Sequence, residues 1–392
     1  PPRSTRILSS AASDVYKSQV SMKSKEILEE VLSHADIKIN GDRPWDIKVN
    51  NEKMFDRIIS NPSLGLGESY MDGWWDCDEI DSFFDRVLRA QLEKKIKGDI
   101  KLSLWTLSRA LINKQTKEKA KEVGEEHYDV GNDLYEKMLD KRMTYTCAYW
   151  KDIENLDQAQ EAKLDLICRK MKLKPGMKVL DIGCGWGSFL QYAAEKYGIS
   201  GVGVTISKEQ VALGNERLKD LDVEIRFQDY RDVEEKFDAV VSVGMFEHVG
   251  PKNYRTFMEQ VDKNLKDDGI FLLHTIGKNK ITFQESDPWY NKYIFPNGVL
   301  PAPQHITKSI EGVFVLEDWH NFGVHYDKTL MAWHKNFVDN WDSLKEKYDE
   351  RFYRMWVYYL LMSAGSFRAR HNQLWQIVLT KKGLKGGYDS IR

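Results

Sequence analysis

Between residues 178 and 274 the chain alternates apolar segments of strand length with amphipathic segments of helix length. Segments that are apolar along their whole length are typical of parallel strands covered by helices on both faces. The sequence therefore predicts an α/β fold with a Rossmann-like, parallel sheet and added helices. The predicted strands are 178–182, 201–204, 223–227, 237–243 and 270–274, followed by a strand at 313–319, helices at 327–347 and 350–369, and a strand at 374–380.

The residues before this region are organised differently. Residues 1–22 are rich in Ser, Lys and Arg without periodicity and are predicted to be a disordered lead-in. Residues 23–112 show mainly helical patterns and are predicted to form a small helical N-terminal domain, in which the glycines of 65–75 mark tight turns. Residues 113–123 are predicted to be a basic linker, and residues 124–392 the catalytic domain.

A basic segment ends the predicted N-terminal domain. Residues 94–121 hold nine Lys or Arg and two acidic residues, a net charge of +7, around a leucine stripe that starts at Leu104 beside Trp105. Two interpretations stay open for residues 101–114. A basic amphipathic helix with a Trp suits a membrane surface, and it equally suits a surface helix that covers a domain junction.

Composition excludes several classes of protein. The chain has 58 Lys+Arg and 60 Asp+Glu, a net charge of −2, which argues against a globally basic nucleic-acid binder. No apolar run reaches the roughly 18–20 residues of a membrane helix. The four cysteines form no C-x-x-C pair, and the first twenty residues lack the apolar core of a signal peptide. The sequence predicts a cytoplasmic protein without a nucleic-acid partner.

The motif Asp181-Ile-Gly-Cys-Gly-Trp-Gly187 follows the strand at 178–182 and opens a helix. Its glycines let the backbone turn sharply and approach a ligand closely at a helix N-terminus. The spacing differs from the dinucleotide G-x-G-x-x-G, and no Walker lysine follows. The motif resembles motif I of S-adenosylmethionine-dependent methyltransferases. The alternative is a glycine turn that serves packing alone.

Polar residues follow the next two strands. Thr205 and Gln210 can bond the ribose hydroxyls of the cofactor as neutral groups, although Ser207-x-x-Gln210 is also a helix capping box. The two roles can coexist. Residues Gln228, Asp229, Tyr230 and Arg231 lie where an adenine ring would bind, or they form a simple polar turn.

Glu247 follows the strand at 237–243, and His274 ends the strand at 270–274. The carboxyl ends of parallel strands form the ligand-binding edge of an open α/β sheet, so both are candidate catalytic residues. Glu247, His248 and His274 lack the fixed spacing of a metal site, and no metal is expected. The loop motifs of DNA methyltransferases are absent.

The chain resembles the bacterial cyclopropane-fatty-acyl-phospholipid synthases from about residue 25 to residue 380. The mycolic acid cyclopropane synthases share the catalytic half and lack the N-terminal domain. The segments that carry the resemblance are 65–75, 126–133, 145–150, the glycine motif, 243–254, 274–277 and 293–298.

The resemblance implies methylene transfer from S-adenosylmethionine to the cis double bond of an acyl chain in a membrane phospholipid, with a bound bicarbonate as general base. It implies that Cys147 and Ile276 hold bicarbonate through backbone groups, and that Glu247, His274 and Tyr326 hold it through side chains. The alternative is C-methylation of a lipid or small molecule without ring closure. The implied cofactor residues are Tyr145, Thr146, Asp181, Gly183, Cys184, Gly185, Gly187, Thr205, Ile206, Ser207, Gln210, Gln228, Asp229, Tyr230 and Arg231.

The resemblance also implies a homodimer that binds the inner face of the membrane peripherally. In one respect the chain departs from its relatives. Ser363 stands where related sequences often carry a Cys for which a nucleophilic role has been proposed. A serine without a paired base does not replace a thiolate, so the sequence argues against covalent catalysis there.

Overall fold

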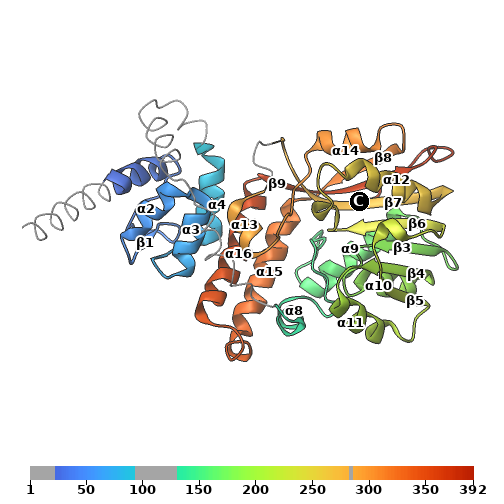
Figure 1. The fold of residues 1–392 in the computed structure, drawn as a ribbon, viewed down its shortest axis with the longest axis horizontal. Helices are drawn as coiled ribbons and strands as arrows, with labels where there is room; N and C mark the ends of the chain where they lie inside the picture. Colours follow the sequence, from blue (N-terminus) through green and yellow to red (C-terminus); the bar gives the residue numbers. More distant parts are fainter. Residues whose placement is uncertain (1–22, 93–129, 282–285) are drawn as a thin grey trace, which may run out of the picture. The chain divides into compact units, whose positions relative to one another are not determined.

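The computed structural model describes residues 23–92, 130–281 and 286–392, which divide into two compact units (Figure 1). The first unit includes Asp287–Ile294 and Asp342–Ala369 together with the residues up to Val130. The second comprises Gly131–Ser286, Phe295–Trp341 and Arg370–Arg392. The predicted lead-in at 1–22, the basic segment and the linker at 113–123 lie outside the described residues. None of the described helices is long and apolar enough to cross a membrane.

The second unit is built on a sheet that has seven strands in its described part, in the order β5-β4-β3-β6-β7-β9-β8. Strands β3 to β7 pair in parallel, whereas β9 runs antiparallel to both β7 and β8. The α/β prediction is confirmed, and the last strand makes the sheet mixed. The bounds are β3 (Lys178–Ile182), β4 (Ser200–Thr205), β5 (Val223–Phe227), β6 (Phe237–Val243), β7 (Leu265–Lys278), β8 (Val315–Asn321) and β9 (Asn372–Thr380).

Helices cover both faces of this sheet. Asn155 caps the start of α9 and Ser207 that of α11, each accepting a hydrogen bond from the backbone three residues on. The helices of the unit are α8 (Asn132–Met138), α9 (Leu156–Lys170), α10 (Ser188–Tyr197), α11 (Lys208–Leu218), α12 (Tyr254–Asn264), α14 (Pro303–Ile310) and α15 (Val324–Asp339), with 3-10 turns η1 (Tyr230–Asp232) and η2 (Phe246–His248).

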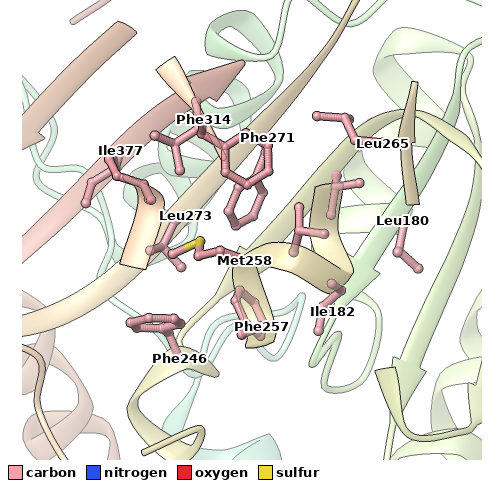
Figure 2. Close-up of a cluster of buried hydrophobic side chains, with 14 of the residues drawn as sticks. Leu180, Ile182, Phe246, Phe257, Met258, Leu265, Phe271, Leu273, Phe314 and Ile377 are labelled. Carbon is pink, nitrogen blue, oxygen red and sulfur yellow. The ribbon is translucent and has the colours of Figure 1, made fainter. Parts of the chain in front are cut away.

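Alternate residues of the strands enter two separate cores, because successive side chains of a strand point to opposite faces. Leu180 and Phe271 pack with Phe257 and Met258 of α12, and Figure 2 shows this cluster. Their strand neighbours enter the other core, where α9 and α10 pack. Fully burying a side chain such as Leu180 stabilises the fold by about 1.5–3 kcal/mol. Both faces are therefore closed, and the sheet's carboxyl edge is left for a ligand.

The first unit draws on two parts of the chain. Its N-terminal elements are a helix over residues 23–33, β1 (Lys48–Val49), α2 (Lys53–Ser60), α3 (Pro62–Met71), β2 (Trp75–Asp76) and α4 (Ile80–Arg89), and its later elements are α13 (Pro288–Tyr293) and α16 (Glu350–Arg368). Tyr358 of α16 packs against Phe84, with ring centroids 5.5 Å apart. The predicted catalytic domain at 124–392 is therefore not continuous in space, since α13 and α16 complete the core of the first unit.

The glycines at 65 and 67 do not mark turns, contrary to the prediction. Both lie inside α3. A Cβ added at Gly67 would lie 2.3 Å from the Trp289 ring, so this glycine allows α13 to approach α3 closely. Gly73, with φ of +70°, does occupy a turn.

Candidate active site

The glycine motif forms a tight loop between β3 and α10. The backbone N–H groups of Gly183 and Cys184 both donate to the Val204 carbonyl of the neighbouring strand. Gly183 has φ of +78°, and a Cβ there would lie 2.5 Å from the Met245 side chain. The loop therefore lies at the carboxyl ends of β3, β4 and β6, and the N-terminus of α10 follows directly. The close approach seen here is to Met245, and the predicted approach of this loop to a ligand stays a prediction.

Asp181 is buried in β3, and its Oδ1 has no hydrogen-bond partner. Burial raises the pKa of Asp181 to about 7, although the positive charge of Lys163 opposes that rise. Lys163 in α9 is itself fully buried, and its Nζ donates to Thr146 Oγ1 at 2.8 Å. Burial lowers the pKa of Lys163 to about 8. A predicted cofactor residue, Asp181, thus offers an unoccupied acceptor inside the site.

Sequence reasoning missed Lys163. Helical spacing could have identified it, because Lys163 lies on the same face of α9 as the buried core residues Ala159 and Ile167. A lysine at a core position of an amphipathic helix is rarely buried unless it has a partner.

At the end of β4, the Thr205–Gln210 segment shows the predicted capping role, and its role in binding the ribose stays a prediction. Ser207 Oγ accepts from the Gln210 backbone N–H and caps α11, as expected of a capping box. Thr205 Oγ1 donates to Gln210 Oε1 at 2.7 Å, so these side chains bond each other. Ile206 between them is exposed.

At the end of β5, the predicted adenine segment forms a polar turn. Asp229 accepts from the backbone and the guanidinium of Arg231, which hold the pKa of its carboxyl below the usual range. Gln228 donates to the Asp232 carbonyl, and Tyr230 packs against Phe257. Gln228, Asp229 and Arg231 therefore form a polar turn, and the binding of an adenine ring at this segment stays a prediction.

Glu247 lies in η2, just after β6. Its Oε1 accepts the backbone N–H of Ile276 at 2.6 Å, and its Oε2 is buried without a partner. Burial raises the pKa of Glu247 to about 7. Ile276 was predicted to hold bicarbonate through its backbone. In the structure its N–H is instead taken by Glu247, because β7 runs past η2 at this point.

His274 lies two residues before Ile276 on β7 and is fully buried. Its Nδ1 is 3.3 Å from Gln376 Nε2 of β9, and its Nε2 has no partner. Burial, together with the charges of Lys163 and Lys170, holds the pKa of His274 well below its ordinary value. With the amide of Gln376 donating to Nδ1, the neutral imidazole carries its proton on Nε2. His274 thus presents an unused donor and Glu247 an unused acceptor.

Aromatic contacts join the remaining predicted residues. Tyr326 of α15 is buried and meets Trp333 edge-on, and the ring of Tyr145 lies 5.2 Å from the same Trp333. The Cys147 thiol is fully buried, which raises its pKa, so it is not a thiolate. The segment that holds Tyr145, Thr146 and Cys147 therefore packs along α15.

Ser363 lies in α16 of the first unit. Its hydroxyl donates to the Tyr359 carbonyl at 2.6 Å and also bonds the Tyr290 hydroxyl. These contacts pair the serine with no base, in agreement with the argument against a nucleophile at this position. The described residues contain no group of three or more His, Cys, Asp or Glu that could hold a metal ion.

Residues 114–377 match the family described as Mycolic acid cyclopropane synthetase. The chain belongs to this family. It is 56% identical over 361 residues to the cyclopropane-fatty-acyl-phospholipid synthase of Escherichia coli (strain K12), a similarity that covers 92% of this chain and 94% of that protein. The relationship makes this family member an S-adenosylmethionine-dependent enzyme of the methyltransferase class.

Solved structures agree with this assignment. The cyclopropane synthase MmaA2 from Mycobacterium tuberculosis is 30% identical, with a TM-score of 0.62, over 66% of this chain and 98% of its own. The mycolic acid cyclopropane synthase CmaA1, complexed with SAH and CTAB, is 30% identical, with a TM-score of 0.61 over the same shares. Both cover about two thirds of this family member, whereas the Escherichia coli relative covers nearly all of it.

Proposed function

We propose that the protein transfers a methylene group from S-adenosylmethionine to the cis double bond of unsaturated acyl chains in membrane phospholipids. The observation that carries the proposal is the buried Glu247, held by the Ile276 N–H with its second oxygen unpartnered, beside the strand edge that bears the glycine loop. The similarity to the Escherichia coli phospholipid enzyme over 92% of the chain supports the substrate class.

The chemistry requires a base in a dry site. Attack of the alkene on the sulfonium methyl forms a carbon–carbon bond, breaks the carbon–sulfur bond and leaves a carbocation. Loss of one proton from the transferred carbon closes the ring. The burial of Glu247, His274 and Tyr326 excludes the water that would trap the cation. Positioning the sulfonium in line with the alkene is the task of the glycine loop and Asp181.

Bicarbonate fits the unpartnered atoms of this site. When bound, it supplies the base that accepts the ring-closing proton. Glu247 Oε2 can accept from its hydroxyl, and His274 Nε2–H can donate to one of its oxygens. Tyr326 is proposed as a second donor, and Cys147 as a backbone ligand. Ile276 acts through Glu247, since its N–H is already bonded.

The test is mass spectrometry of phospholipid vesicles incubated with the protein and S-adenosylmethionine. We expect unsaturated acyl chains to gain one carbon and two hydrogens and to lose their olefinic NMR signals, while saturated vesicles stay unchanged. Glu247→Gln should lower the rate by about 100-fold or more and leave cofactor binding intact. Branched methyl products instead of rings would overturn ring closure and favour simple C-methylation.

The proposal includes two features that follow from the resemblance, a homodimer and peripheral binding at the cytoplasmic face of the membrane. Vesicle co-sedimentation and analytical ultracentrifugation test them separately from the chemistry. Absence of co-sedimentation with unsaturated vesicles would count against a bilayer substrate.

A further inference from the structure

Lys163 is a fully buried lysine that the reaction scheme above does not use. It lies in α9, on the stripe that carries the core residues Ala159 and Ile167. Its Nζ donates to Thr146 Oγ1 at 2.8 Å, and Thr146 belongs to the segment with Tyr145 and Cys147. Burying an ammonium group removes its hydration and costs free energy, so a lysine at this position calls for an explanation.

Asp140, Cys147 and Asp181 act electrostatically on the pKa of Lys163, and Lys163 acts on the pKa of His274. Asp140 already accepts the backbone N–H groups of Arg142 and Thr144. The Cys147 thiol and the His274 imidazole are buried in their neutral forms. Asp181 is the remaining partner. Its Oδ1 is buried and unpartnered, and among the described residues Lys163 is the cation that lowers the pKa of its carboxyl.

We propose that Lys163 is a positioning residue of the S-adenosylmethionine site, which fixes Thr146 by a hydrogen bond and places a buried positive charge within electrostatic reach of the unpartnered Asp181 carboxyl. The inference rests on S-adenosylmethionine as co-substrate and is independent of which molecule receives the carbon. Lys163 is not a catalytic residue in this role, since it acts through Thr146 and Asp181.

The same helix provides a matched control. Lys170, seven residues further along α9, is also fully buried. Its Nζ lies 3.0 Å from His320 Nδ1 and 3.9 Å from Asp318 Oδ2, so it contacts a different pair of residues from Lys163. Lys170→Met removes a buried ammonium from α9 just as Lys163→Met does. A purely structural role for both lysines predicts equal effects on stability and on ligand binding.

The experiment is calorimetric titration of the full chain with S-adenosylhomocysteine between pH 5.5 and 8.5, with thermal unfolding measured in parallel. We expect Lys163→Met to weaken binding about tenfold at pH 7.5 and Lys170→Met to leave binding unchanged, while both lower the unfolding midpoint. Thr146→Val, which removes the acceptor and keeps the charge, should weaken binding about threefold.

The pH dependence separates positioning from structure. A carboxylate ligand loses affinity as the pH falls through its pKa, so binding to the parent should fall on acidification near pH 7. Without the ammonium the pKa of Asp181 rises further, and the fall should begin at a higher pH in Lys163→Met. Thr146→Val should keep the parent profile.

Two results would overturn the inference. One is equal weakening by Lys163→Met and Lys170→Met, which would make both lysines structural. The other is a loss of S-adenosylhomocysteine binding on acidification that occurs at the same pH in Lys163→Met as in the parent. If Lys163→Met does not fold, Thr146→Val decides, and binding at the parent's affinity would overturn the proposed hydrogen-bond role.

Discussion

A single carboxyl group links burial to chemistry in this protein. Glu247 has one oxygen fixed by the Ile276 N–H and a second that is buried and free to bond. Burial raises the pKa of Glu247 to about 7, near physiological pH, where a group can take or release a proton at little cost. The same burial means that ionisation of Glu247 lowers the free energy of unfolding.

This cost predicts an unusual pH dependence for Glu247→Gln. Because the pKa of Glu247 is raised from 4.5 to about 7 in the folded protein, the folded state binds more protons than the unfolded state between these values. The stability of the parent therefore falls as the pH rises through this window. Relative to the parent, the glutamine variant should gain about 2–3 kcal/mol in free energy of unfolding between pH 5 and pH 8.

Urea denaturation at both pH values measures the difference. Glu161→Gln is a control of opposite sign. Burial opposes the shift, but hydrogen bonds from Arg142 and Lys141 lower the pKa of Glu161 below 4.5. This variant should therefore lose stability relative to the parent as the pH rises toward 4.5, and should keep a constant difference from the parent between pH 5 and pH 8. A constant difference between Glu247→Gln and the parent across the range would contradict the prediction.

At the scale of elements, the apolar strands were predictable. The strands at 178–182 and 237–243 have the predicted bounds, since strands buried over most of their length are mostly apolar. The strand at 223–227 also has the predicted bounds, although it lies at the edge of the sheet and is mostly not buried. Strand β7 extends beyond the predicted 270–274 at both ends. It reaches Lys278 because β9 pairs with residues 270–278, and it reaches Leu265 because that residue pairs with Phe237 of β6. Pairing between strands that are distant in the sequence depends on the tertiary fold and produces no recognisable pattern in the residues of either strand. The bond between Glu247 and the Ile276 N–H was unpredictable for the same reason.

In helix α3, helix propensity and side-chain packing favour different residues at position 67. Glycine inside a helix costs about 0.5–1 kcal/mol relative to alanine, so local propensity alone favours Gly67→Ala. The added methyl would overlap the Trp289 ring, however, and overpacking costs about 1–3 kcal/mol. We expect a net destabilisation of about 1–2 kcal/mol in urea denaturation.

Gly73→Ala is the comparison for this variant. Its methyl would meet no neighbour within 4 Å, so only the positive φ is penalised. It should cost about 1 kcal/mol, without the loss of aromatic near-ultraviolet circular dichroism expected when Trp289 is displaced. Stabilisation by Gly67→Ala would show that Trp289 moves aside without cost.

At the scale of the whole molecule, the first unit depends on distant chain segments. Helix α16 packs on α3 and α4 and contributes a nearly continuous buried run from Met355 to Phe367. Arg354 donates to the Tyr70 carbonyl and pairs with Asp76, tying α16 to the region of β2. Residues 23–92 alone should therefore be largely unfolded by circular dichroism.

Adding a peptide of residues 342–369 to that fragment should increase its helical signal beyond the sum of the separate spectra. A peptide with Tyr358→Ala and Gly365→Leu should fail to do so, because Tyr358 packs on Phe84 and a Cβ at 365 already meets the Asp81 carbonyl. A fragment that is folded without the peptide would contradict this dependence.

The interleaving of the two units also imposes an order on synthesis. The chain passes from one unit to the other after residues 130, 286, 294, 341 and 369. When α16 has been synthesised, β9 is the one described strand of the second unit still to be made. About 280 residues separate the end of α4 from the end of α16, so the first unit cannot be completed until that length of chain has been added. At roughly 5–20 residues per second this is about 15–55 s. During that interval α3 and α4 lack their contacts with α16, so we expect the nascent N-terminal segment to bind chaperones until α16 has been made.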